Sequence, residues 1–181
     1  MANEDVVALL ERQHQEIRQL FGEVERARGD ARKDAFHELV RLLSVHETAE
    51  EELVHPEVRK QSAGEPVVRA RVGEEHRAKE LLSTLDGLGP DAEGFDTLLF
   101  ELRDDVLAHA EHEEREEFPL LRQAYDEKRL RAMADTVEAA EALAPTRPHP
   151  GAESPAANVV LGPVAAIMDR TRDAIRKALG R

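Results

Sequence analysis

Apolar residues recur at alternating three- and four-residue steps in three long segments of the chain, which places them on one face of a helix. The stripes span 7–24, 36–53 and 95–113, and each includes a histidine among leucine, valine and phenylalanine residues. A fourth segment, 66–88, lies between the last two and is bounded by glycine- and proline-containing turns. Because such stripes have to be covered, the pattern predicts an all-α helical bundle.

Composition agrees with helices and excludes several classes of partner. Aromatic residues make up 3% of the chain, and strands are usually richer in them. The net charge of −13 repels phosphate backbones and anionic lipids, so we expect neither a nucleic-acid nor a membrane partner. Without cysteine there is no thiolate chemistry and no cysteine-bound cluster. The acidic start lacks the pattern of a signal peptide, and we expect a cytoplasmic protein.

The chain divides into three parts by composition. Residues 1–143 include the bundle helices and a fifth helix that Asp126 caps, whereas 144–157 hold four of the nine prolines and predict an extended linker. Residues 158–181 predict a C-terminal amphipathic helix. Its apolar stripe packs either on the flank of the bundle or on a partner, such as a second copy in a homo-oligomer.

Two stretches, 45–56 and 108–119, share a His-x-x-x-Glu pattern that is followed by a proline. A further histidine precedes each stretch by about one helix length, so the chain resembles a duplicated helical hairpin. For each consecutive pair of these four histidines, the midpoint falls at or near a predicted turn, so antiparallel helices would bring all four to one level. Each glutamate lies one turn beyond its histidine on the same face. The candidate residues are His14, His46, Glu50, His76, His109 and Glu113.

Imidazoles and carboxylates inside leucine stripes cost several kcal/mol each unless they are paired or bind a metal. Four nitrogens and two carboxylates exceed the ligands of one tetrahedral zinc ion. They suit two six-coordinate ions with bridging carboxylates, and a sulfur-free set favours iron first and manganese second. The sequence therefore predicts a two-metal site.

Two features complicate this assignment. In the third segment, Leu85 lies about 180° from His76 around a regular helix, so His76 and the leucines do not share one face. The remaining histidines, including His55 and His112, fall off the apolar stripes, and we interpret them as ordinary residues. The other members of that group are His37 and His149.

The ordered motif His14, His46-x-x-x-Glu50, His76, His109-x-x-x-Glu113 resembles the hemerythrin-like, or HHE cation-binding, family over about residues 4–125. The resemblance implies an up-down four-helix bundle that holds two oxo- or hydroxo-bridged iron ions. It assigns the four histidines as terminal ligands and the two glutamates as bridges.

The chain departs from the oxygen-carrying hemerythrins at two positions. Glu80 stands where they have a second histidine on the third helix, and Glu114 stands where they have an aspartate on the fourth. Glu80, four residues after His76, is therefore expected beside the metal, and Glu47 is a weaker candidate ligand. These departures argue against reversible oxygen carriage.

The expected activity is redox handling of peroxide, dioxygen or nitric oxide at a non-haem di-iron centre. Replacing a histidine by a carboxylate gives a harder site that favours ferric iron, which binds peroxide but does not hold dioxygen reversibly. Catalase-like breakdown of hydrogen peroxide is the specific expectation, which would make the protein an oxidoreductase. Iron or oxygen sensing, iron storage and oxygen binding without turnover are the alternatives, and no side chain stands out as a general base.

Overall fold

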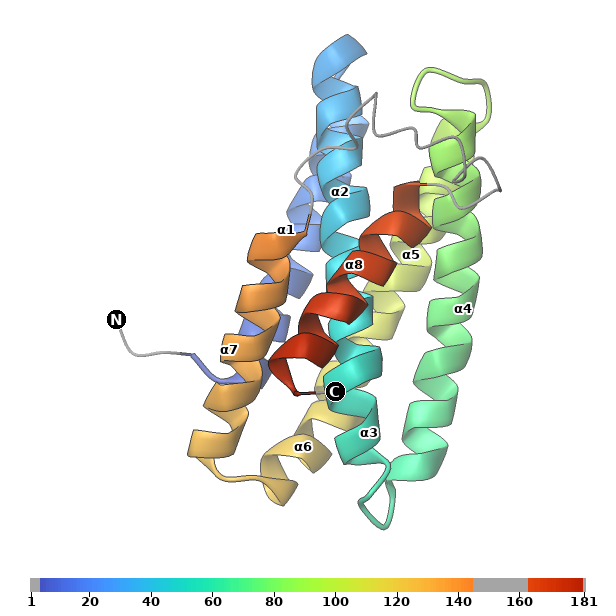
Figure 1. Cartoon of the computed structure of the whole chain (residues 1–181). Coiled ribbons are helices and arrows are strands. Elements are labelled where there is room, and N and C mark those ends of the chain that lie inside the picture. The colour runs from blue at the N-terminus through green and yellow to red at the C-terminus, as the bar shows by residue number, and fades with distance from the viewer. Residues whose placement is uncertain (1–3, 145–162, 181) are drawn as a thin grey trace.

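The computed structural model describes residues 4–144 and 163–180, and the regular elements in these residues are all helices. The four longest run side by side along the molecule, so the predicted helical bundle is confirmed (Figure 1). The four are α1 (Val6–Arg26), α2 (Gly29–Ala49), α4 (Gly64–Leu88) and α5 (Phe95–His112). The shorter elements are η1 (Glu50–Val54), α3 (His55–Val58), η2 (Glu113–Glu117), α6 (Phe118–Ala124), α7 (Glu127–Leu143) and α8 (Pro163–Ala178).

The long helices pack as two antiparallel hairpins. α1 lies against α2, α4 lies against α5, and α1 also contacts α5. The Asp5 side chain accepts a hydrogen bond from the Ala8 N–H at 2.9 Å and so caps the start of α1. Gly89 and Gly94 bound the turn between α4 and α5 with φ angles of 82° and 84°, a conformation that glycine adopts without steric cost.

The last two helices cover one side of the bundle. α7 lies beside α1, and α8 crosses α2 between α7 and α4 (Figure 1). Ile167, Thr171 and Ile175 of α8 are buried, so its apolar stripe packs on the flank of the bundle. α8 falls within the predicted helix 158–181, whereas the predicted linker 144–157 lies, apart from its first residue, outside the described residues.

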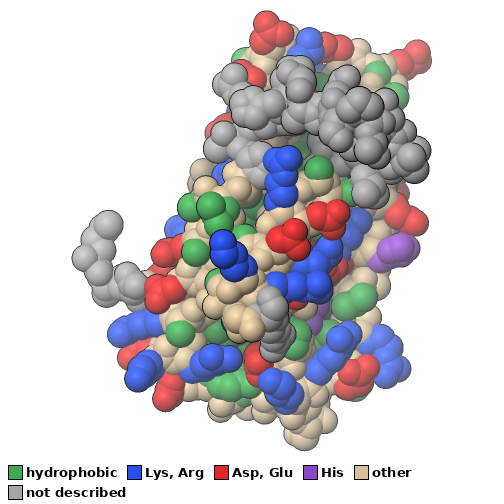
Figure 2. Space-filling view, viewed as in Figure 1, with side chains coloured by type: hydrophobic (Ala, Val, Ile, Leu, Met, Phe, Trp, Pro, Cys, Tyr) green, Lys and Arg blue, Asp and Glu red, His purple; other side chains and the backbone are tan. Residues whose placement is uncertain are grey.

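The surface on this side is mixed in charge. Basic and acidic side chains are interspersed there, and hydrophobic side chains are scattered between them (Figure 2). Among the described residues, no helix has the length and apolar character needed to cross a membrane.

Two π-helical turns interrupt the long helices at equivalent places. η1 follows α2 and η2 follows α5, and a proline comes two residues after each turn. In each turn the carbonyl of the first glutamate accepts a hydrogen bond from the N–H five residues later, that of His55 or Phe118. Proline lacks an N–H and clashes with the carbonyl four residues earlier, so a wider turn accommodates it. The sequence predicted breaks at the prolines, but the helices continue through them with the register shifted by one residue.

Candidate metal centre

A layer of buried polar side chains divides the hydrophobic core into two parts. One apolar cluster includes Phe36 and Leu99, and the other includes Leu10 and Phe118. On α1, α2 and α4 the change from one cluster to the other occurs at polar residues, and along the segment from α5 to α6 it falls between Val106 and Phe118. The buried polar residues of the layer are His14, His46, Glu47, Glu50, Arg71, Glu75, His109 and Glu113. Such a layer is costly without compensation, because each buried charge loses several kcal/mol of hydration.

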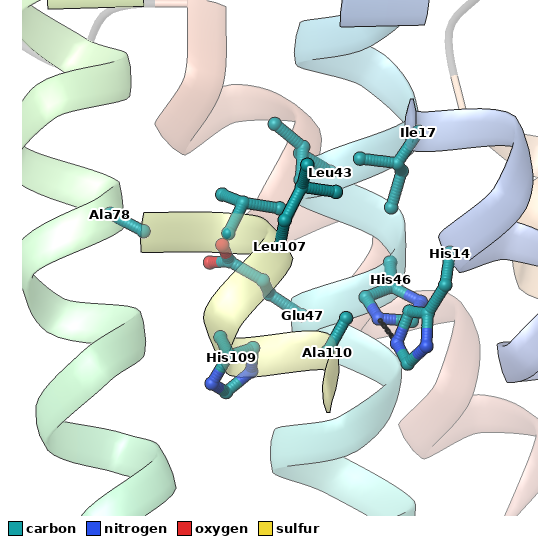
Figure 3. A pocket seen from close by; sticks show the side chains of 10 residues that line it. His14, Ile17, Leu43, His46, Glu47, Ala78, Leu107, His109 and Ala110 are labelled. Atoms are coloured by element: carbon teal, nitrogen blue, oxygen red, sulfur yellow. Dashed lines mark hydrogen bonds between the residues drawn. The ribbon is translucent and has the colours of Figure 1, made fainter. Parts of the chain in front are cut away.

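Two of the histidines face each other between α1 and α2. The Nε2 atoms of His14 and His46 lie 3.1 Å apart, and the rings point toward one another (Figure 3). Glu113 Oε2 lies 3.2 Å from the His14 Nε2 atom, and Glu50 Oε1 lies 3.3 Å from the His46 Nε2 atom. One ligand atom from each of these four residues lies within 4.8 Å of the others. We call the space that His14 and His46 border position A.

A second group of donors lies beside the first. Ligand atoms of Glu50, Glu75 and His109 lie within 4.8 Å of one another, and we call the space that Glu75 and His109 border position B. Glu50 belongs to both groups. Glu113 also reaches both, because its Oε1 atom lies 3.1 Å from His109 Nε2 while its Oε2 atom faces His14. The two carboxylates therefore stand between position A and position B, as bridging ligands do.

The carboxylates of Glu50 and Glu113 face histidine nitrogens at 3.1–3.3 Å but lack regular hydrogen bonds to the described residues. Glu50 and Glu113 are fully buried, and none of their four side-chain oxygens has a hydrogen-bond partner in the described part of the chain. Each unsatisfied buried acceptor costs about 1–3 kcal/mol. Two divalent or trivalent cations would satisfy all four oxygens, so the donor set fits two metal ions. Nitrogen and oxygen donors without sulfur suit iron or manganese.

Each histidine of the centre is held by a second contact on its other ring nitrogen. The Nδ1 atom of His14 lies 2.8 Å from Glu114 Oε1, and that of His46 lies 2.9 Å from Gln13 Oε1. The Nδ1 atom of His109 lies 2.9 Å from Glu74 Oε2. An Nδ1–H that donates to an oxygen leaves Nε2 unprotonated and aimed at a metal. Gln13 and Glu74 were not among the predicted residues, because their contacts reach across helices and follow no stripe.

The pKa values of three buried groups at the centre are shifted by burial and by their neighbours. Burial and the neighbouring His14 lower the pKa of His46 to about 3, which leaves its imidazole neutral. Burial and the nearby Glu113 raise the pKa of Glu50 well above its usual value. Burial opposes a charge on His109, but Glu113 raises the pKa of its ring well above the usual value. A metal that bound Glu50 and His109 would compete with protons at these two groups.

Known proteins share the family and the fold of this chain. The hemerythrin HHE cation binding domain family matches residues 5–121, more than half of the chain. The chain belongs to this family. A hemerythrin HHE cation binding domain-containing protein from Mycobacterium kansasii has a similar crystal structure, with a TM-score of 0.67 at 21% identity. The match covers 77% of this chain and 86% of that one. No curated protein matches the chain.

One predicted ligand of this HHE domain protein lies outside the centre. His76 has a side chain that is 76% exposed, and the neighbouring residue Glu75 is buried in its place. The reason is the apolar stripe of α4, which runs through Val68, Ala78 and Leu82 and includes position 75. The assignment of His76 was wrong because it followed residue type, whereas packing of the helix follows the stripe. The structure brings together the other five predicted residues.

The two further carboxylates that were considered as ligands, Glu80 and Glu47, have different outcomes. The Glu80 side chain is 70% exposed and lies beside His76, so the prediction that it stands near the metal was wrong. Glu47 is buried, and its carboxylate lies 3.6 Å from the Lys79 ammonium. Burial raises the pKa of Glu47 to about 8. The buried carboxylate of α4 that lies close to Glu50 and His109 is that of Glu75.

His55 is buried beside Glu75, although its place in the sequence predicted a position off the apolar stripe. Its ring is buried between two carboxylates, with Nε2 2.5 Å from Glu75 Oε1 and Nδ1 2.8 Å from Glu117 Oε1. In a regular helix it would lie off the stripe of Glu50. The π turn η1 brings a residue five positions later onto the same face, because its hydrogen bonds span five residues. The glutamate-to-proline spacing shared with η2 is the signal that could have shown this.

A small cavity opens beside the centre. His14, His46, His109 and Glu47 border it, and Figure 3 shows the side chains that line it. The remaining walls are apolar and are formed by Ile17, Leu43, Ala78, Val106, Leu107 and Ala110. The cavity has a volume of about 10 Å³, close to the space that one water molecule requires. Only a very small molecule fits there without rearrangement.

Proposed function

We propose that this HHE domain protein holds two iron ions at positions A and B and breaks down hydrogen peroxide. The observation that carries the proposal is the pair Glu50 and Glu113, whose four buried oxygens lack partners and lie between two sets of nitrogen and oxygen donors. Iron bound there would supply Lewis-acid and redox chemistry. Manganese is a less favoured occupant.

The protein's own residues would hold and shield the reaction space. The Nδ1 contacts of His14, His46 and His109 fix the rings, so the Nε2 donors keep their direction while a metal changes its charge. The apolar walls exclude bulk water and larger substrates from the cavity. Its volume, close to that of one water molecule, limits access to very small molecules.

Peroxide breakdown requires no partner protein. One hydrogen peroxide is reduced to water while a second is oxidised to dioxygen, so the electrons balance without an external reductant. The carboxylate donor Glu75 supports this choice over oxygen carriage, because an additional oxygen ligand favours the ferric state. Glu75 therefore takes the role that was expected of Glu80, an oxygen donor that favours ferric iron.

The test combines metal analysis, absorption spectroscopy and an oxygen-electrode assay on freshly purified protein. We expect about two iron atoms per chain, a near-ultraviolet oxo-to-iron band and release of dioxygen on addition of peroxide. Glu50→Ala should lose the metal, the band and the turnover together, whereas Glu80→Ala, at an exposed site, should keep all three. A single zinc ion without the band would contradict the proposal.

One observation favours a second candidate, a sensor of iron or oxygen. Arg172 of α8 lies 3.4 Å from Glu51 and 3.3 Å from Glu52, and these glutamates follow Glu50 directly in η1. A change at Glu50 could therefore alter how α8 docks. Metal-dependent protease cleavage of the 144–181 segment, in the absence of peroxide turnover, would favour sensing over catalysis.

A further inference from the structure

The two metal positions differ in the donors that are not shared. Position A has the imidazole nitrogens of His14 and His46, whereas position B has one imidazole, from His109, and the carboxylate of Glu75. Glu50 and Glu113 serve both positions, so they do not contribute to the difference. Position A is therefore richer in nitrogen, and position B is richer in oxygen.

Two donors of the protein, on His55 and Lys79, hold the Glu75 carboxylate in place. Its Oε1 atom lies 2.5 Å from His55 Nε2, and its Oε2 atom lies 3.3 Å from Lys79 Nζ. The side chain is 1% exposed, so it has no alternative position in solvent. Each carboxylate oxygen has two lone pairs, and one contact leaves the second pair for a metal. Glu75 is thus a built oxygen donor of position B.

The donor difference changes which ion each position prefers. Imidazole suits iron, zinc and copper, whereas carboxylate, carbonyl and water ligands suit manganese and magnesium. Divalent manganese is also the weakest binder in the first-row series, and its disadvantage against iron is smallest where oxygen replaces nitrogen. Position A should therefore discriminate against manganese more strongly than position B.

We infer that the centre loads its two positions unequally, with iron at position A and either iron or manganese at position B, and that Glu75 sets this difference. The inference rests on the proposed two-metal function and specifies it further. The exposed His76 plays no part in it, although it stands next to Glu75 in the sequence.

The test is metal competition on the wild-type protein. Metal-free protein is loaded without oxygen from an equimolar mixture of ferrous and manganous salts and crystallised, and anomalous diffraction is measured at the absorption edges of both metals. We expect a manganese-to-iron ratio at least about tenfold higher at position B than at position A. Tenfold is the lower end of the changes in metal affinity that residues around a metal ligand cause. Equal ratios, or manganese enriched at position A, would overturn the inference and leave the two-metal function intact.

Two variants locate the cause. Glu75→His should bring the manganese-to-iron ratios at the two positions to within about twofold of each other, well below the tenfold difference expected for the wild type. Glu80→His, on the exposed face of α4, is the control and should leave both ratios as in the wild type. If Glu75→His fails to fold, as circular dichroism would show, Glu75→Gln keeps the shape and should lower manganese at position B. An unchanged ratio in a folded Glu75 variant would overturn the role of this residue. Fewer than two bound metals in the wild type would overturn the proposed function as well.

Discussion

The metal-free protein should become more stable when a bridging carboxylate is removed. In Glu50→Met a side chain of similar length replaces two buried oxygens that have no hydrogen-bond partner in the described part of the chain. Each such oxygen costs about 1–3 kcal/mol, and the raised pKa of Glu50 reduces the total because a protonated carboxyl group carries no buried charge. We expect a gain of about 1–3 kcal/mol in the metal-free state. For a chain of this size that corresponds to a rise in Tm of roughly 2–12 °C.

The metal-bound state should show the opposite order. A metal at 100 times its dissociation constant stabilises the wild type by about 2.7 kcal/mol, and Glu50→Met should lose most of this gain. The assay is thermal and urea unfolding, with a chelator and with ferrous iron under argon. Glu80→Met is the control, because that side chain is exposed and its stability should stay within about 0.5 kcal/mol of the wild type. If Glu50→Met lowers the metal-free stability by more than about 2 kcal/mol, the carboxylate is a satisfied structural group and our reasoning is wrong.

Three further predictions concern neighbouring positions. Glu75→Ala should lower the iron content whereas His76→Ala should not, and equal iron content in the two purified variants would show that α4 has a different register. Burial opposes a charge on His55, but Glu117 and Glu75 raise its pKa to about 9. The stability that protonated His55 contributes is therefore complete below the ordinary pKa of 6.5 and is lost as the pH rises through 9. Between these pH values the metal-free wild type should lose about 3 kcal/mol relative to His55→Gln in urea unfolding, and parallel pH profiles would contradict this. Ala110→Leu fills the cavity and should reduce peroxide turnover at least about tenfold while iron content is kept, and unchanged turnover would show that substrate does not use the cavity.

The sequence was sufficient for the helices whose stripes are continuous. In α1, α2 and α5 the leucine, valine and phenylalanine positions agree with His14, His46 and His109, and the structure places these three histidines in the buried layer. That a metal binds there is part of the proposal. In α4 the apolar stripe and the histidine disagreed, and the stripe was the correct guide because burial of Val68 and Leu82 orients the whole helix.

Two other features follow from interactions that a helical repeat does not describe. A proline after a glutamate-rich stretch is compatible with a break, a kink or a π turn, so the inward position of His55 did not follow from a regular helix. The contacts of Gln13 and Glu74 join different helices, and only the packed structure shows which polar side chains meet. The flank position of α8 was one of two options, because an amphipathic stripe does not identify what covers it.

The central claim is that Glu50 and Glu113 bridge two metal ions, and iron-edge anomalous diffraction from crystals of the iron-loaded wild type tests it most directly. We expect two anomalous peaks about 3.5–4 Å apart, each beside carboxylate oxygens of both glutamates, with His14 and His46 at one and Glu75 and His109 at the other. A single peak, or peaks that neither carboxylate contacts, would contradict the claim.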